Sequence, residues 1–96
     1  MSTGTATISV TIPQALRPLC GGKAEVELEG HDVRSVLAEL ERQHHEVWVR
    51  LCDERGEPRP HINVFVNDDH VRARDGLDTP LTAGDVVTIL PAVSGG

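Results

Sequence analysis

The sequence predicts an α+β domain in which one main helix packs on one face of a mixed sheet. Apolar and polar residues alternate in several short segments, as they do in strands with one buried face. Residues 33–40 instead repeat with the period of a helix. The expected order of elements is β-β-α-β-β-β, without internal repeats or linkers. A chain of 96 residues therefore forms a single small domain.

The first two strands are predicted from period-two alternation. In residues 5–12 the apolar Ile8, Val10 and Ile12 alternate with polar residues, and Pro13 ends the strand because it cannot donate to a ladder. Residues 16–23 contain a proline and two glycines and are predicted to form a connecting turn. Residues 24–29 alternate again, so they are expected to form a second strand that pairs with the first. The polar face of this strand is a row of glutamates: Glu25, Glu27 and Glu29.

The main helix is predicted from an apolar stripe with Asp32 as its N-cap. The side chain of Asp32 can accept from the free N–H groups of the first turn. The members of the stripe are Val33, Val36, Leu37 and Leu40. The pattern continues to Leu51, so either this helix extends that far or a second short helix follows. The β-branched residues Val47 and Val49 disfavour a single unbroken helix.

The second half of the chain is predicted to contain three more strands. Residues 53–60 form a loop, residues 62–66 the third strand and residues 67–69 a turn rich in Asn and Asp. A short strand is expected around Val71. After a further loop, residues 86–90 form the last strand. The first and last strands are both apolar, and we expect them to lie in the centre of the sheet.

Composition and charge narrow the possible partners. The net charge is −6 and the nine basic residues are scattered, which argues against nucleic acid and favours basic protein partners. The N-terminus does not resemble a signal peptide, and no apolar run approaches the length of a membrane span. We therefore expect a cytoplasmic protein that binds no membrane, with Cys20 and Cys52 reduced.

No self-contained catalytic or metal-binding set is apparent. His44, His45 and Glu46 are adjacent rather than spaced by a helical turn, so a solvated face is the better interpretation than a metal site. Asp68 and Asp69 lack the rest of a calcium loop, and the Gly-Gly-Lys at residues 21–23 lacks the Walker pattern. The cysteines are interpreted as passive thiols. We expect no metal and no cofactor bound by the chain itself.

The chain ends in a segment suited to a different kind of chemistry. Residues 1–90 are predicted to form the folded domain and residues 91–96 a flexible tail, because Pro91 interrupts strand pairing. Six extended residues span about 20 Å, and Gly95 and Gly96 lack a Cβ, so they make the thinnest possible end. The Gly96 carboxylate could thus enter a narrow active site of a partner. The alternative is a tail without a chemical role.

The tail and the strand before it resemble those of the ubiquitin-like sulfur carriers, the family that contains ThiS and MoaD. The likeness is most specific in residues 87–96, with a closing strand, a proline, small residues and Gly-Gly. It extends over nearly the whole chain and implies a β-grasp fold. Further matches resemble the CysO type of actinobacterial carrier: Ile12-Pro13, Leu16-Arg17-Pro18, Gly21-Gly22 and residues 63–68. Ser94 stands where that type usually has Ala.

The resemblance implies a carrier that is a co-substrate rather than an enzyme. A partner of the MoeB, ThiF or MoeZ type would use MgATP to adenylate the Gly96 carboxylate, which would then become a thiocarboxylate. The implied recipient is a cysteine synthase that uses O-phosphoserine, with a metalloprotease that releases the cysteine, or an enzyme of secondary metabolism. The residues expected to contact partners are Pro91, Ala92, Val93, Ser94, Gly95 and Phe65.

Three other functions remain compatible with the sequence. The chain could be the small subunit of molybdopterin synthase, a protein modifier that forms isopeptide bonds through Gly96, or an interaction module. Phe65 alternates with Val64 and Val66, so it is expected on the outward face of its strand. There it is either part of a contact patch or covered by a neighbouring loop.

Overall fold

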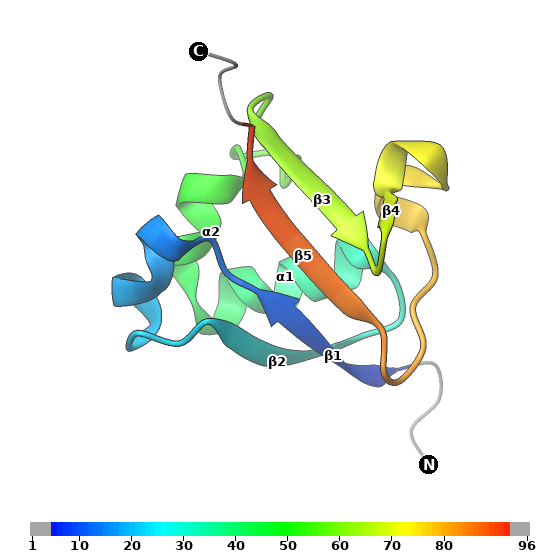
Figure 1. The fold of residues 1–96 in the computed structure, drawn as a ribbon, viewed down its shortest axis with the longest axis horizontal. Coiled ribbons are helices and arrows are strands. Elements are labelled where there is room, and N and C mark those ends of the chain that lie inside the picture. The colour runs from blue at the N-terminus through cyan, green and yellow to red at the C-terminus, as the bar shows by residue number, and fades with distance from the viewer. Residues whose placement is uncertain (1–4, 93–96) are drawn as a thin grey trace.

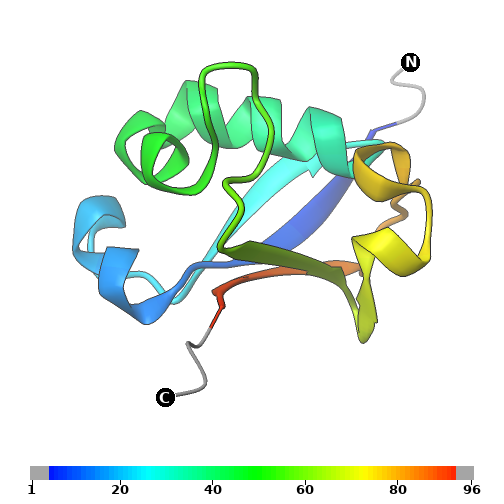
Figure 2. The same ribbon diagram turned by 90° about the horizontal axis from the view of Figure 1, so that it is seen from above.

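The computed structural model describes residues 5–92 and shows a mixed sheet with two α-helices on one of its faces (Figures 1 and 2). The five strands lie in the order β2-β1-β5-β3-β4. They are β1 (Ala6–Thr11), β2 (Glu25–Gly30), β3 (Ile62–Val66), β4 (Asp69–His70) and β5 (Val86–Pro91). The helices are α1 (Val33–Gln43) and α2 (His45–Leu51) with the 3-10 helices η1 (Gln14–Cys20), η2 (Val71–Ala73) and η3 (Gly76–Asp78).

Strand β5 lies in the middle of the sheet. It pairs in parallel with β1, where Val10 is opposite Val87, and antiparallel with β3, where Val64 is opposite Ile89. Strand β2 pairs antiparallel with β1 and forms one edge of the sheet. The predicted central position of the first and last strands is therefore confirmed.

The helical layer begins at Asp32, as predicted. The Asp32 carboxylate accepts from the Ser35 N–H at 2.8 Å, while the Ser35 hydroxyl accepts from the Asp32 N–H at 3.1 Å, which completes a capping box. Partial burial opposes ionisation of Asp32, but these hydrogen bonds outweigh it and lower the pKa of the carboxyl. The chain leaves the helical conformation at His44, so α2 is a separate helix. This resolves the alternative that the sequence left open.

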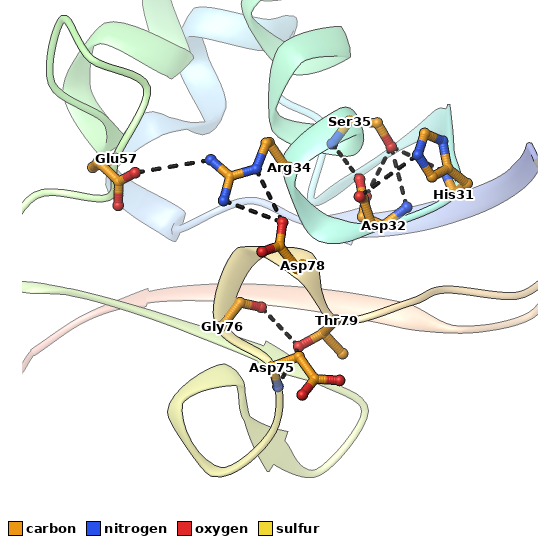
Figure 3. A network of polar contacts seen from close by, with 9 residues as sticks. All are labelled: His31, Asp32, Arg34, Ser35, Glu57, Asp75, Gly76, Asp78 and Thr79. Carbon is orange, nitrogen blue, oxygen red and sulfur yellow. Dashed lines mark hydrogen bonds and ion pairs between the residues drawn. The ribbon is translucent and has the colours of Figure 1, made fainter.

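A network of polar contacts connects the start of α1 to the end of η3 and to Thr79 after it (Figure 3). The Arg34 guanidinium donates twice to Asp78 at 3.2 Å, and the Val33 N–H donates to the Thr79 carbonyl at 3.2 Å. Thr79 is fully buried, and its hydroxyl donates to the Gly76 carbonyl and accepts from the Asp75 N–H. The long connection before β5 is thereby held against the helical layer.

Two predicted boundaries in the loops are wrong. Most of the predicted turn at residues 16–23 is the 3-10 helix η1, which ends at Gly21 in the left-handed region with φ of 73°. The short strand predicted around Val71 ends at His70, because Val71 is buried and starts η2 instead. In both cases the 3-10 helix that replaces the predicted element contains a buried apolar side chain, Cys20 in η1 and Val71 in η2.

The last strand also extends beyond its predicted end. Pro91 belongs to β5 and lies opposite Ile62, and the Ala92 N–H donates to the His61 carbonyl at 2.6 Å. Hydrogen-bonded and non-bonded pairs alternate along an antiparallel ladder, so Pro91 occupies a position whose nitrogen points away from β3. The missing N–H of Pro91 therefore removes no hydrogen bond between β5 and β3. The boundary between domain and tail, predicted between residues 90 and 91, is wrong because Pro91 belongs to β5.

Candidate functional site

Some residues of the predicted site belong to the part of the chain that the structure describes, and the others do not. Gly96, the predicted reacting residue, and the partner-binding residues Val93, Ser94 and Gly95 lie outside the described residues. Pro91, Ala92 and Phe65 are described. Pro91 and Ala92 are exposed at the end of β5, and Phe65 lies on the neighbouring strand β3.

The end of β5 is fixed by the sheet around it. Val87 and Ile89 are fully buried, and the bond from Ala92 to His61 continues the pairing to the last described residue. Gly96 is the fourth residue after Ala92, a span of at most about 14 Å when extended. The predicted reacting residue therefore lies within a short length of chain from the last hydrogen bond of the sheet. The anchoring role of His61 was not predicted, since a backbone carbonyl leaves no sequence signal.

A mostly apolar groove of about 240 Å³ lies beside this end of β5. It is formed where η1 and α2 approach the first residue of β3 and the last of β5. Its lining residues are Pro13, Ala15, Leu16, Arg50, Leu51, His61, Ile62 and Pro91. Sequence analysis missed this groove because its walls come from four separate segments that only the fold brings together.

The face of the sheet opposite the helices carries a small apolar surface. It consists of the outward side chains Phe65, Val86 and Leu90, which we call the outward patch. Leu90 is 44% exposed, one of only two large exposed hydrophobic side chains in residues 5–92. Phe65 lies opposite Thr88 and Leu90 opposite Asn63, so Phe65 and Leu90 are diagonal neighbours on one face.

Phe65 is outward, as predicted, and half-buried by a side chain rather than by a loop. The His70 ring packs edge-on against Phe65 with centroids 5.1 Å apart. His70 Nδ1 accepts from the Arg72 N–H at 3.0 Å, so it carries no proton, and Nε2 lies 3.1 Å from Asn63 Oδ1. In the neutral ring Nε2 therefore donates to Asn63. These bonds fix the orientation of His70, which sequence analysis did not assign to the site.

The two thiols are buried away from these surfaces. Burial, followed by the nearby carboxylate of Asp53, raises the pKa of Cys52 to about 12. Cys20 is 7% exposed, and its thiol donates to the carbonyls of Arg17 and Lys23. Burial keeps both thiols from solvent, and the raised pKa of Cys52 makes that thiol a poor nucleophile.

The sheet order, the parallel pairing of the first and last strands and the single helical layer define a β-grasp, ubiquitin-like protein. In this order the last strand, β5, is central and lies between β1 and β3. The chain belongs to the ThiS family, whose model matches residues 10–96. No helix of the described residues is long and apolar enough to cross a membrane.

Three relatives illustrate the likeness. The sulfur carrier protein CysO of Mycobacterium tuberculosis is 41% identical over 91 residues, which cover 93% of this chain and 98% of that protein. The structure of the BexX/CysO complex of Amycolatopsis orientalis matches with a TM-score of 0.82 and 40% identity over 93% of this chain and 99% of the matched chain. Small archaeal modifier protein 1 of Methanosarcina acetivorans matches with a TM-score of 0.80 and 31% identity over 96% and 98%.

Proposed function

We propose that this chain is a sulfur carrier protein whose Gly96 carboxylate is adenylated by a partner enzyme and converted to a thiocarboxylate. The observation that carries the proposal is the end of β5. A buried central strand runs to an exposed, hydrogen-bonded Ala92, only four residues before Gly96. The similarity to sulfur carriers over 93% of the chain supports the same role.

The chemistry explains why a partner is needed. A carboxylate is a poor electrophile, so one of its oxygens first attacks the α-phosphorus of ATP and releases pyrophosphate. Sulfide or a persulfide sulfur then attacks the acyl carbon and displaces AMP, and a persulfide adduct is finally cleaved by a thiol. The chain contributes no reacting side chain. It positions the terminus, because a tethered group reacts at a raised effective concentration.

The adenylating partner, of the MoeB, ThiF or MoeZ type, is proposed to bind the outward patch and the tail together. Phe65 on β3 and Leu90 on β5 lie on the face of the sheet that is opposite the α-helices. Figure 2 shows that both α-helices cover the other face. An aromatic and an aliphatic side chain on one exposed face are typical anchors of a protein interface. The net charge of −6 favours a basic surface around the partner's active site. MgATP belongs to this partner, and we place the reaction in the cytoplasm.

The sulfur acceptor is proposed from the relatives. The likeness to CysO favours a cysteine synthase that uses O-phosphoserine, followed by a metalloprotease that releases the new cysteine. The complex of the Amycolatopsis orientalis CysO with BexX makes a BexX-type enzyme a second candidate acceptor. Either acceptor would receive the same thiocarboxylate.

Intact-mass measurement tests the proposal. The chain is incubated with an adenylating enzyme, MgATP and sulfide, and we expect one oxygen of the Gly96 carboxylate to be replaced by sulfur. A variant with one alanine added after Gly96 should unfold at the same urea concentration but gain no sulfur. Equal sulfur incorporation into both proteins would refute Gly96 as the reacting residue.

A protein modifier is the second candidate function, favoured by the likeness to small archaeal modifier protein 1. Activation of Gly96 would be the same, but the product would be an isopeptide bond to a lysine. Peptide mapping of conjugates from cells distinguishes the two functions, because only a modifier leaves a branch that ends in Gly96 on lysines of other proteins. Cleavage after Arg74 would leave residues 75–96 as that branch.

A further inference from the structure

The β2 edge of the sheet is open in the part of the chain that the structure describes. Strand β2 pairs with β1 over all six of its residues, from Glu25 to Gly30, and no other described strand borders it (Figure 1). An open strand edge presents backbone N–H and C=O groups that can pair with another chain. The β2 edge is therefore a potential docking site that is separated from β3 by β1 and β5.

The hydrogen-bonding pattern between β1 and β2 shows which backbone N–H and C=O groups of β2 are free to bond with another chain. The Ile12 N–H donates to the Ala24 carbonyl at 2.9 Å, and the register continues this pairing with Val10 opposite Val26 and Ile8 opposite Leu28. Bonded and non-bonded pairs alternate in an antiparallel ladder. Val26, Leu28 and Gly30 are therefore bonded to β1, whereas the N–H and C=O groups of the three glutamates point to the open side.

The same three residues carry uncompensated charge. The side chains of Glu25, Glu27 and Glu29 are exposed on one face of the strand, and none forms an ion pair with the described residues. Among the described residues, these three carboxylates accept one hydrogen bond, from the Ser9 hydroxyl to Glu25 at 3.2 Å. Residues directly opposite each other on paired strands share a face, so a strand added to this edge would place alternate side chains beside the glutamates.

A groove of about 470 Å³ receives the other side chains of such a strand. It lies between β2 and the C-terminal end of α1, and its lining residues are Lys23, Glu25, Val26, Glu27, Gln43 and His44. The groove is mostly polar at its helical side. Small or polar side chains would suit it at the positions between the basic ones.

We propose that the β2 edge docks an extended segment of a partner protein in which Lys or Arg alternates with small or polar residues. The segment adds a strand to the sheet and pairs its basic side chains with Glu25, Glu27 and Glu29. A second copy of this chain is rejected, because pairing of two β2 strands would set glutamates against glutamates. This interaction needs neither the tail nor the outward patch, so a partner can hold the carrier by this edge while Gly96 reacts elsewhere.

Binding of a synthetic peptide to the full chain tests the proposal. The probe is an acetylated, amidated heptapeptide of alternating lysine and threonine, and its control has the four lysines in one block. We expect the alternating peptide to bind at least fivefold more tightly at low salt. It should also slow amide hydrogen exchange at Glu25, Glu27 and Glu29 in NMR spectra. Equal affinity of the two peptides, or no change in exchange, would overturn the proposal.

Matched variants distinguish the addition of a strand to β2 from non-specific electrostatic attraction between the basic peptide and the acidic chain. Glu27→Lys should weaken binding of the alternating peptide about tenfold, whereas Glu41→Lys, the same charge change on the exposed surface of α1, should weaken it less than twofold. Glu27→Pro should abolish the slowed exchange, since it removes a free N–H without removing a bond to β1, while Glu27→Gln retains it. Equal effects of Glu27→Lys and Glu41→Lys, or dimerisation of the chain through β2, would contradict the assignment.

Discussion

The two faces of the sheet differ although the same strands build both. On the covered face, Ile8, Val10, Val87 and Ile89 are fully buried beneath the helices. On the open face, Leu90 is 44% exposed, Phe65 is half-buried and the β2 glutamates are exposed. Alternate residues of one strand thus serve stability and recognition. Because the two sets do not overlap, substitutions in neighbouring positions should affect either the free energy of unfolding or partner binding.

Strand β5 should show the largest contrast. Ile89→Ala removes a fully buried side chain, and we expect it to lower the free energy of unfolding by about 2–5 kcal/mol. Leu90→Ala, one residue further along, should cost about 1 kcal/mol or less because its side chain is already partly in water. Urea unfolding of both variants measures the difference. Similar losses would mean that Leu90 is part of the core.

Strand β2 provides a second contrast at Gly30. A Cβ at Gly30 would lie 2.6 Å from Val36 Cγ2 and 3.0 Å from the Val36 nitrogen, so Gly30→Ala should force α1 away from the sheet. We expect a loss of about 1–3 kcal/mol in unfolding free energy. Glu29→Ala on the open face should stay within about 0.5 kcal/mol of the native chain. A Gly30→Ala variant as stable as Glu29→Ala would show that the helix can shift without cost.

A substitution of Phe65 tests whether the open face of the sheet binds the adenylating enzyme. Phe65→Ala should weaken binding of the adenylating enzyme by about 1–2 kcal/mol, roughly fivefold to thirtyfold, because it removes the aromatic member of the outward patch. Titration of the enzyme by calorimetry measures this loss. Glu54→Ala, in the exposed loop before β3, is the control and should bind like the native chain. Unchanged binding of the Phe65 variant would remove the outward patch from the proposed interface.

Asp32 should show the smallest effect, and its effect should depend on pH. Asp32→Ala removes the N-cap of α1 and should cost about 1 kcal/mol at pH 7. Because the pKa of Asp32 is lowered in the folded state, the ionised carboxylate stabilises the fold above its unfolded pKa of about 3.9. That contribution disappears as the pH falls through the folded pKa. Thermal unfolding of both proteins between pH 7 and acid should show the difference shrinking, and a constant difference would contradict this assignment.

The regular elements of the fold could be predicted because a periodic apolar pattern reports burial directly. Ile8 and Val10 gave the period of a strand, and Val36 and Leu40 that of a helix, and all four are fully buried. The short irregular elements could not be predicted in this way. Val71 and Cys20 are isolated apolar residues, and only the shape of the finished core determines that they turn inward.

For three of the predicted site residues, the sequence pattern predicted the position in the fold, and their predicted role stays a prediction. Pro91, Ala92 and Phe65 lie where the sequence placed them relative to the last strands, apart from the one-residue extension of β5. Contacts between distant segments were not predictable. The bond from Ala92 to His61 and the edge-on packing of His70 against Phe65 both depend on strand register, which becomes visible only in the sheet.

The parallel pair of β1 and β5 has a consequence for folding. It joins residues near opposite ends of the chain, such as Ser9 and Val86, and contacts of such long sequence separation form slowly because a long loop must be closed first. That closure completes the sheet, because it joins the β1–β2 pair to the β3–β5 pair that carries Phe65, Leu90 and the anchored Ala92. Formation of the whole sheet should therefore be limited by the β1–β5 pair rather than by the β3–β5 pair, whose strands are closer in sequence.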